Sequence, residues 1–262
     1  MVSLYTTLWM VTQAYAVPLG YYGSADACQS VAKGLALPPA AQVLCVPSDT
    51  AMPLDYRSQP QALASQSVAP PQPTASADIA NVSQKGVPFI GDPNAPVVMA
   101  YWFDYQCPFC KQNEETVLPH LIDDYVKPGK LKILFKDYAF LGPDSQTAGF
   151  AARAVWEIAP DKFYEWHKTM YDHQGDENSG WAKKENVLAL TKTIAGIDAA
   201  KVEQLMHDHA ADYQKAIEAD GAEGAAMGVN GTPGAIVGKQ LIIGAQPLEQ
   251  FKTAIDGVLS AK

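Results

Sequence analysis

Residues Val97 to Glu114 read VVMAYWFDYQCPFCKQNE, and the expected architecture of the domain follows from this stretch. Its first part belongs to a near-continuous apolar run, Ala95 to Phe103, which predicts a central strand buried on both faces. From Cys107 to Val126 the pattern predicts a helix, with Pro108 in the first turn, where a missing N–H costs nothing. Two cysteines separated by two residues therefore lie where a buried strand passes into a helix.

That position predicts different chemistry for the two thiols. The thiolate is the reactive form of cysteine, and a helix N-terminus offers it partial positive charge and free backbone N–H groups. We therefore expect Cys107 to be an exposed nucleophile with a lowered pKa. Cys110 lies one turn further on, close enough to attack a mixed disulfide formed on Cys107.

A C-x-x-C pair also occurs in zinc sites, which need two further ligands. Cys28 and Cys45 lie across a flexible segment, and His207 and His209 point to different faces of a predicted helix. We therefore expect no metal. A purely structural disulfide within the C-x-x-C pair is disfavoured as well, because so short a loop removes little entropy from the unfolded chain.

Composition divides the 262 residues into three regions. Residues 1–56 are too few for a large core, and we expect a structural Cys28–Cys45 disulfide to stabilise this module. A second redox pair is the alternative, which the spacing does not favour. Residues 57–84 are rich in Pro, Ala, Ser and Gln and poor in large aliphatic residues, which predicts a linker. Residues 85–262 predict a globular domain.

The N-terminus has some features of a signal peptide. Ala14-Tyr15-Ala16 looks like a signal-peptidase site, but no Lys or Arg precedes Lys33, and three threonines interrupt the apolar run. We expect instead a strand of the mature chain from Leu8 to Ala16.

Within the globular domain the periodicity predicts a mixed α/β sheet with an inserted helical domain at about 143–228. Pro119 should kink the first helix, because its ring opposes the carbonyl of Glu115. Further strands are predicted at Leu131 to Phe135, Ala235 to Val237 and Leu241 to Ile243, the last two as a hairpin, before a closing amphipathic helix from Leu248.

The active-site block resembles the thioredoxin superfamily, and specifically its DsbA branch. Cys-Pro-aromatic-Cys, with Phe109 as the aromatic residue, follows a strand that ends in aromatic and acidic residues. Gly231-Thr232-Pro233 resembles the loop of this superfamily that faces the two cysteines. The resemblance covers residues 87–262 and implies a cis peptide before Pro233, with the backbone of Thr232 free to bind an extended substrate segment.

The resemblance also suggests a buried charged group below the cysteines that manages protons during exchange. Glu114 lies four residues after Cys110 on the same helix face, and Lys136 closes the second strand. The plainer interpretation is a solvated helix charge and a strand-end lysine. Burial is the property that would separate the two interpretations.

A formal net charge of -9 and a pI near 5.0 argue against a nucleic-acid partner, and no apolar run is long enough for membrane insertion. The resemblance implies a thiol:disulfide oxidoreductase without a cofactor. It would oxidise folding secreted proteins with free thiols in the periplasm or another extracytoplasmic space, and a membrane redox partner would reoxidise it.

Two alternatives stay open. The first is a disulfide isomerase or reductase of the DsbC and DsbG kind, dimerising through residues 1–56. The second is a thioredoxin-fold adaptor that binds a client through this module and makes little use of its cysteines.

Overall fold

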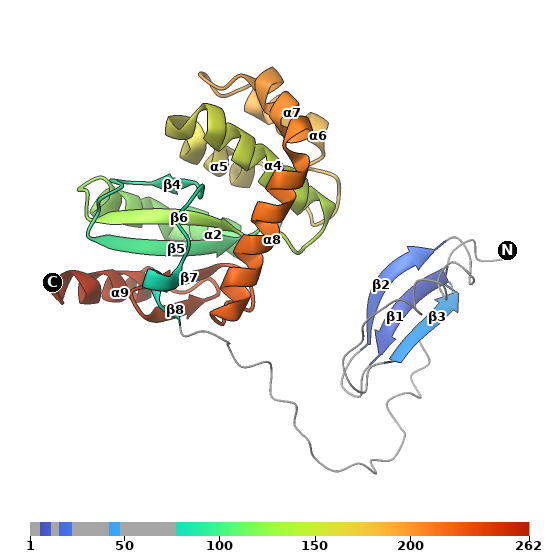
Figure 1. Ribbon diagram of the computed structural model, residues 1–262, viewed down its shortest axis with the longest axis horizontal. Helices are drawn as coiled ribbons and strands as arrows, with labels where there is room; N and C mark the ends of the chain where they lie inside the picture. The colour runs from blue at the N-terminus through green and yellow to red at the C-terminus, as the bar shows by residue number, and fades with distance from the viewer. Residues whose placement is uncertain (1–5, 12–15, 23–41, 48–76, 262) are drawn as a thin grey trace, which may run out of the picture. The chain divides into compact units, whose positions relative to one another are not determined.

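The structure is a computed structural model that describes residues 6–11, 16–22, 42–47 and 77–261 (Figure 1). The chain divides into two units, Met1–Ser67 and Val68–Lys262. In the first, β1 (Thr6–Val11) lies between β2 (Ala16–Tyr22) and β3 (Gln42–Pro47) in a three-stranded antiparallel sheet.

The expected single strand from Leu8 to Ala16 is wrong, because β1 ends at Val11 and Ala16 begins β2. Val11 pairs with Ala16 in an antiparallel register, so each strand satisfies the backbone groups of the other. Cys28 lies outside the described residues, and the predicted Cys28–Cys45 disulfide therefore lies outside them as well.

The second unit contains a five-stranded mixed sheet in the order β4-β6-β5-β7-β8. Among the described strands of this sheet, β5 and β6 pair in parallel and the other pairs are antiparallel. The strands are β4 (Phe89–Ile90), β5 (Val97–Phe103), β6 (Leu131–Asp137), β7 (Gly234–Val237) and β8 (Gln240–Ile243). The central strands are buried almost throughout, as the apolar run predicts, and β7 and β8 form the predicted hairpin.

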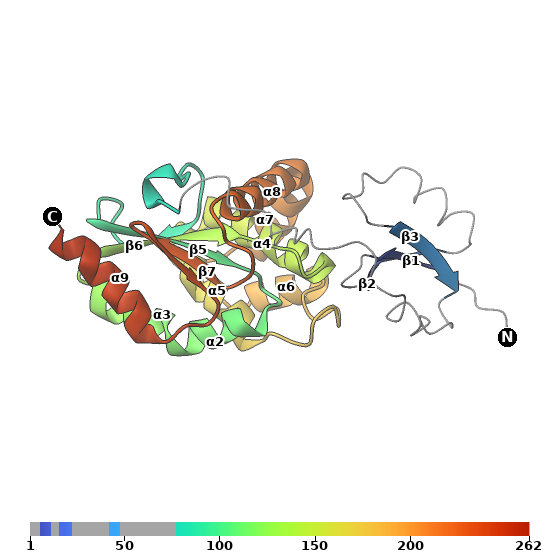
Figure 2. The ribbon, with the colours of Figure 1, turned by 90° about the horizontal axis from the view of Figure 1, so that it is seen from below.

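Side chains of β5 alternate between two cores, because successive residues of a strand point to opposite faces. Met99, Tyr101 and Phe103 belong to the larger core, and Ala100 and Trp102 belong to the smaller one. Figure 2 shows α2 (Pro108–Thr116), α3 (Leu118–Leu121) and α9 (Leu248–Ser260) along one face of the sheet. The π-helical turn η3 (Ile122–Val126) continues α3.

The predicted kink at Pro119 is confirmed as a break. α2 ends at Thr116, and Val117 leaves helical geometry at φ -120° and ψ -57° before α3 begins. Proline cannot donate to the preceding turn and crowds its carbonyl, so the helix divides just before it.

The inserted helical domain lies between β6 and β7, as predicted. It consists of α4 (Pro143–Ile158), the 3₁₀ turn η4 (Pro160–Lys162), α5 (Phe163–Asp172), α6 (Lys184–Thr191), α7 (Ala199–Asp208) and α8 (Ala210–Ala226). The packed stripes of these helices form part of the larger core.

The C-terminal end of the predicted linker is corrected by the structure. Residues 77–84 belong to the folded unit, with the 3₁₀ turn η2 (Ile79–Asn81) packed beside β5. Val82 is buried in the smaller core, and the N–H of Ser83 donates to Glu223 at 2.7 Å. Composition does not indicate that residues 77–84 are folded, because their apolar side chains pack against residues far along the chain.

Candidate active site

Cys107 is the N-cap residue of α2, and Pro108 occupies the first helical position. The N–H of Cys107 donates to the carbonyl of Asp104 at 3.0 Å, and the carbonyl of Cys107 accepts from the N–H groups of Cys110 and Lys111 at 3.1 and 3.2 Å. A tight turn thus joins β5 to α2 and places Cys107 at the positive end of the helix.

Asp104 organises this turn from a buried position. One carboxylate oxygen accepts from the N–H of Gln106 at 2.8 Å and from the hydroxyl of Ser145 at 2.6 Å. The other accepts from the N–H groups of Phe140 and Leu141, each at 3.0 Å. Burial raises the pKa of this carboxyl, while the hydrogen bonds oppose the rise. Asp104 therefore joins the cysteine-bearing turn to the start of the helical domain.

The loop before β7 faces the same cysteine. The peptide between Thr232 and Pro233 is cis, as predicted, and in its thiol form Cys107 donates from Sγ to the carbonyl of Thr232 at 3.3 Å. The hydroxyl oxygen of Thr232 is buried and has no hydrogen-bond partner among the described residues. The fold therefore brings Thr232 and Cys107 together across 125 positions of sequence.

The expected exposure of Cys107 needs correction. Only 5% of Cys107 is exposed, and Cys110 is fully buried. The sulfur of Cys107 points toward the carbonyl of Thr232, so the loop before β7 covers it. The exposed residues of the motif are Pro108 and Phe109, and Phe109 is 59% exposed. A substrate thiol therefore meets a cysteine that is almost covered rather than one on an open surface.

The two thiols differ in acidity, as predicted. The pKa of Cys107 is lowered to about 6, chiefly because the Cys110 thiol donates to it, with further help from the N–H groups of Cys110 and Phe109. Burial opposes this shift. The pKa of Cys110 is raised well above its ordinary value by burial and by its bond to Cys107. At neutral pH Cys107 is therefore the thiolate and Cys110 the thiol.

Glu114 is buried, so its interpretation as a solvated helix charge is wrong. Oε1 of Glu114 lies 2.9 Å from Nε2 of His167, and Oε2 accepts from the hydroxyl of Tyr164 at 3.3 Å. The other ring nitrogen of His167 lies 2.8 Å from the hydroxyl of Tyr105. Glu114 thus connects α2, on the face that carries Cys110, to the helical domain.

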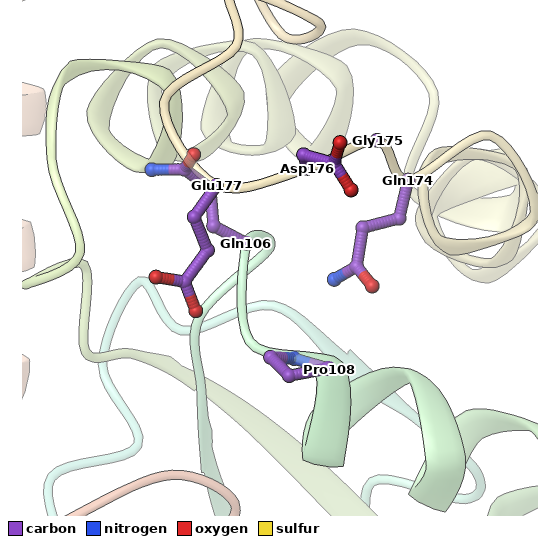
Figure 3. A pocket seen from close by; sticks show the side chains of 6 residues that line it. All are labelled: Gln106, Pro108, Gln174, Gly175, Asp176 and Glu177. Atoms are coloured by element: carbon purple, nitrogen blue, oxygen red, sulfur yellow. The ribbon is translucent and has the colours of Figure 1, made fainter.

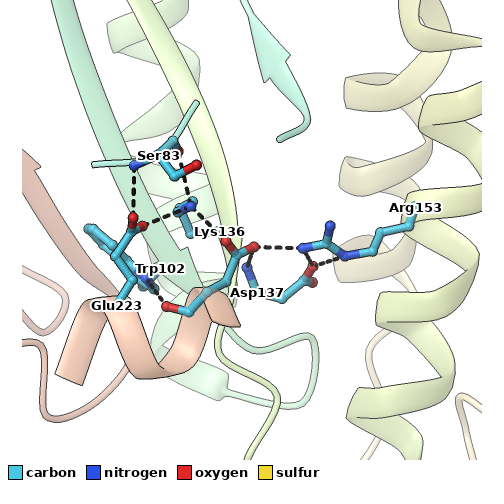
Figure 4. Close-up of polar contacts among 7 residues, drawn as sticks. Ser83, Trp102, Lys136, Asp137, Arg153 and Glu223 are labelled. Atoms are coloured by element: carbon cyan, nitrogen blue, oxygen red, sulfur yellow. Dashed lines mark hydrogen bonds and ion pairs between the residues drawn. The ribbon is translucent and has the colours of Figure 1, made fainter. Parts of the chain in front are cut away.

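Lys136 is buried as well, but it lies on the other face of the sheet. Along β6 it shares a face with Leu134, which belongs to the smaller core. Its Nζ lies 2.6 Å from Asp220 and 2.8 Å from Glu223, and it donates to the carbonyl of Ser83 at 3.1 Å (Figure 4). The helix that carries the cysteine pair packs on the opposite face, so Lys136 is not the charged group beneath that pair.

Two residues of the site were missed from the sequence. His167 lies far from the cysteines in the chain, and its signal was its place on the apolar stripe of Phe163, Trp166 and Met170, where a polar residue needs a buried partner. From the sequence, Asp104 is only an acidic residue at the end of the predicted strand. Three of the four donors to its carboxylate lie 36 to 41 residues further along the chain, where no local pattern indicates them.

Within the described residues, no three or more His, Cys, Asp or Glu side chains are arranged to hold a metal ion. In that same part of the chain, no helix has both the length and the apolar character needed to cross a bilayer.

The sequence and fold match those of known proteins. A family model described as Thioredoxin matches residues 83–257. Disulfide bond formation protein D of Bacillus subtilis (strain 168) is 26% identical over 180 residues, which cover 69% of this chain and 80% of that protein.

The solved structures that resemble this one include two at 27% identity. The crystal structure of oxidised BdbD from Bacillus subtilis has a TM-score of 0.63 at 27% identity and covers 71% of this chain and 97% of that chain. The thiol-disulfide exchange protein alpha-DsbA2 from Wolbachia pipientis has a TM-score of 0.58, also at 27% identity. The match covers 67% of this chain and 88% of the Wolbachia chain. The chain belongs to the thioredoxin family and is a DsbA-like thiol:disulfide oxidoreductase.

Proposed function

We propose that the chain is an oxidase that donates the disulfide between Cys107 and Cys110 to dithiols of folding secreted or envelope proteins. Its place of action would be the periplasm or another extracytoplasmic compartment, and a membrane redox partner would reoxidise the pair. The observation that carries the proposal is the opposite shift of the two pKa values, lowered to about 6 for Cys107 and raised for Cys110.

The first step is attack by a substrate thiolate on Sγ of Cys107 in the oxidised protein. The Cys107–Cys110 bond breaks, a mixed disulfide forms on Cys107, and Cys110 leaves with the electron pair. Because the pKa of Cys110 is high, the departing sulfur takes up a proton at neutral pH.

In the second step another thiolate of the same substrate attacks the substrate sulfur of the mixed disulfide. A disulfide forms in the substrate, and Cys107 leaves as a thiolate. Two electrons have passed from the substrate dithiol to the cysteine pair. A low pKa at Cys107 makes it a good leaving group and stabilises the reduced protein, which favours oxidation of the substrate.

The backbone of Thr232 supports the proposed mode of substrate binding. It lies beside Sγ of Cys107 at the start of the segment that leads into β7, so an extended substrate segment could pair there as an added strand. Such pairing recognises backbone and tolerates many sequences, which suits an oxidase with many substrates.

The test is the reduction potential of the cysteine pair, measured by equilibrium with glutathione buffers. An oxidase predicts a value less negative than about −180 mV, the potential of protein disulfide isomerase. A value near about −270 mV, that of thioredoxin, would identify a reductase and contradict the proposal.

The isomerase alternative is favoured by one observation, the separate unit Met1–Ser67 with its own sheet. In a dimeric isomerase this unit would join two copies of the chain. Light scattering on the full chain separates the alternatives: a dimer that also restores activity to a scrambled-disulfide substrate supports the isomerase, and a monomer without that activity excludes it.

A further inference from the structure

A pocket of about 310 Å³ lies beside the reactive cysteine. It is lined by Gln106, Pro108, Gln174, Gly175, Asp176 and Glu177 (Figure 3). Gln106 and Pro108 are the two chain neighbours of Cys107, and the other four residues form the loop that follows α5. The pocket is therefore lined by both neighbours of the residue to which a substrate would be bonded.

Hydrogen bonds hold the pocket loop to the cysteine-bearing turn at one end. The side-chain amide of Gln174 donates to the carbonyl of Tyr105 at 2.7 Å and to that of Cys107 at 3.1 Å. The wall formed by Gln174 is thus bonded directly to the residue that carries the nucleophile.

The other end of the loop is held in the same way. The side-chain oxygen of Gln106 accepts from the N–H of Asn178 at 2.6 Å, and the amide of Asn178 donates to the carbonyl of Leu141 at 2.7 Å. Between the two ends, a Cβ on Gly175 would lie 2.8 Å from Cβ of Trp181. The loop therefore has a defined shape before any substrate binds, which lowers the entropy cost of binding.

The chemistry of the lining is acidic. Asp176 and Glu177 are exposed, no Lys, Arg or His lines the pocket, and neither carboxylate has a hydrogen bond or ion pair within the described residues. Figure 3 shows the side chains of Glu177 and Gln174 extending from the loop toward Pro108. Two unpaired carboxylates beside amide oxygens favour a cationic side chain, and an arginine could bind a carboxylate through two parallel hydrogen bonds.

The pocket also lies within reach of the residues that flank a substrate cysteine. Gln106 and Pro108 adjoin Cys107 in the chain, and one residue of an extended segment advances about 3.3 Å, so a residue one or two positions from a cysteine bonded to Cys107 could reach the pocket. We propose that this pocket is a specificity subsite that binds a Lys or Arg side chain one or two residues from the reacting cysteine of the substrate. The inference rests on the proposed exchange at Cys107. It adds that substrate segments with Lys or Arg near the reacting cysteine react fastest.

The test uses three peptides that differ only at the residue next to a single cysteine, which is Lys, Gln or Glu. The second-order rate constant for mixed-disulfide formation with the oxidised full chain is measured at low salt and at 0.5 M salt. We expect the Lys peptide to react about five-fold faster than the Gln peptide at low salt and the Glu peptide to react more slowly, as for partly exposed ion pairs. High salt should reduce the differences among the three rate constants.

The double variant Asp176→Asn, Glu177→Gln should bring the ratio of Lys to Gln rates to about one. A matched variant, Asp212→Asn with Glu249→Gln, loses two negative charges on α8 and α9 outside the pocket and should keep the five-fold ratio. This pair of variants separates a local subsite from the net charge of the protein.

Equal rates for the Lys and Glu peptides with the natural chain would overturn the subsite, as would a preference that survives in the pocket variant. Failure of the proposed exchange itself is a different result, in which none of the three peptides, including the neutral one, forms a mixed disulfide.

Discussion

Nε2 of His167 lies 2.9 Å from Oε1 of Glu114, and both side chains are buried between the active-site helix and the helical domain. The second ring nitrogen of His167 lies 2.8 Å from the hydroxyl of Tyr105. Each polar atom of the imidazole therefore has a partner, which a buried position requires. This relationship fixes α2, and with it Cys110, against α5.

Loss of that pair should destabilise the fold. Replacing His167 by Leu leaves the buried carboxylate of Glu114 with only the longer bond from Tyr164, and an unsatisfied buried group costs about 1–3 kcal/mol. Urea unfolding of both proteins measures the change in the free energy of unfolding. Glu165→Gln, on the exposed side of the same helix, serves as the control and should stay within about 0.5 kcal/mol. A His167→Leu variant as stable as the control would contradict the assigned role of the pair.

The buried network around Arg153 predicts a pH dependence. Nε of Arg153 donates to Asp137 at 2.9 Å, and its NH2 group lies 2.6 Å from Asp220. The pKa of Asp137 is raised to about 6, chiefly by burial, although Arg153 opposes the rise. The pKa of Asp137 is therefore higher in the folded state than in the unfolded state. For that reason Asp137 contributes stability below about pH 4, and this contribution is lost as the pH rises through about 6.

The measurement is the free energy of unfolding of the natural chain and of Asp137→Asn at several pH values. We expect the natural chain to lose stability relative to the variant between about pH 4 and pH 7, by up to about 3 kcal/mol. A constant difference across this window, or one of opposite sign, would show that Asp137 is not the titrating group.

The hydrogen bond from Cys110 sets the acidity of Cys107. Cys110→Ala removes the donor that contributes most to the lowered pKa, so the pKa of Cys107 should rise from about 6 toward its ordinary value. Cys110→Ser keeps an O–H donor, so it should raise the pKa of Cys107 less than Cys110→Ala does. The pH dependence of thiolate absorbance at 240 nm in the reduced proteins gives both values. An unchanged pKa in Cys110→Ala would mean that the helix N-terminus alone stabilises the thiolate.

Trapping experiments separate an oxidoreductase from an adaptor. In Cys110→Ser the Cys107 thiolate can still attack a disulfide of a substrate protein, which breaks that bond and releases one substrate thiolate. Because the resolving thiol is absent, the mixed disulfides should accumulate and appear as bands that vanish on reduction. Cys107→Ser is the matched control and should trap none. If Cys110→Ser traps nothing and Cys107→Ser keeps its biological effect, the adaptor interpretation replaces the enzymatic one.

The sequence was most informative where a feature depends on near neighbours. The buried run that forms β5, the turn from Cys107 into α2, the break before Pro119 and the closing hairpin all follow from spacing, periodicity and proline geometry. These features position the reactive thiols and could be predicted without any knowledge of the tertiary fold.

Features that depend on distant contacts could not be predicted in this way. The loop at Thr232 covers Cys107, and the alternation of β6 sends Lys136 to the face away from the cysteines. His167 meets Glu114 across 53 positions of sequence. In each case the deciding partner lies on another element, and only the packed fold shows which side chains remain exposed.

The central claim is that the fold stabilises the Cys107 thiolate and therefore the reduced protein. The pKa of Cys107 falls from 9.0 to about 6, so this contribution is fully present above about pH 9 and is lost as the pH falls through about 6. Urea unfolding of the oxidised and reduced proteins between pH 5 and 9 tests the claim most directly. The reduced form should be more stable by about 1 kcal/mol at pH 7, with the difference growing toward pH 9 and shrinking toward pH 5. An oxidised form that is the more stable one at pH 7, or a difference that does not change with pH, would contradict the claim.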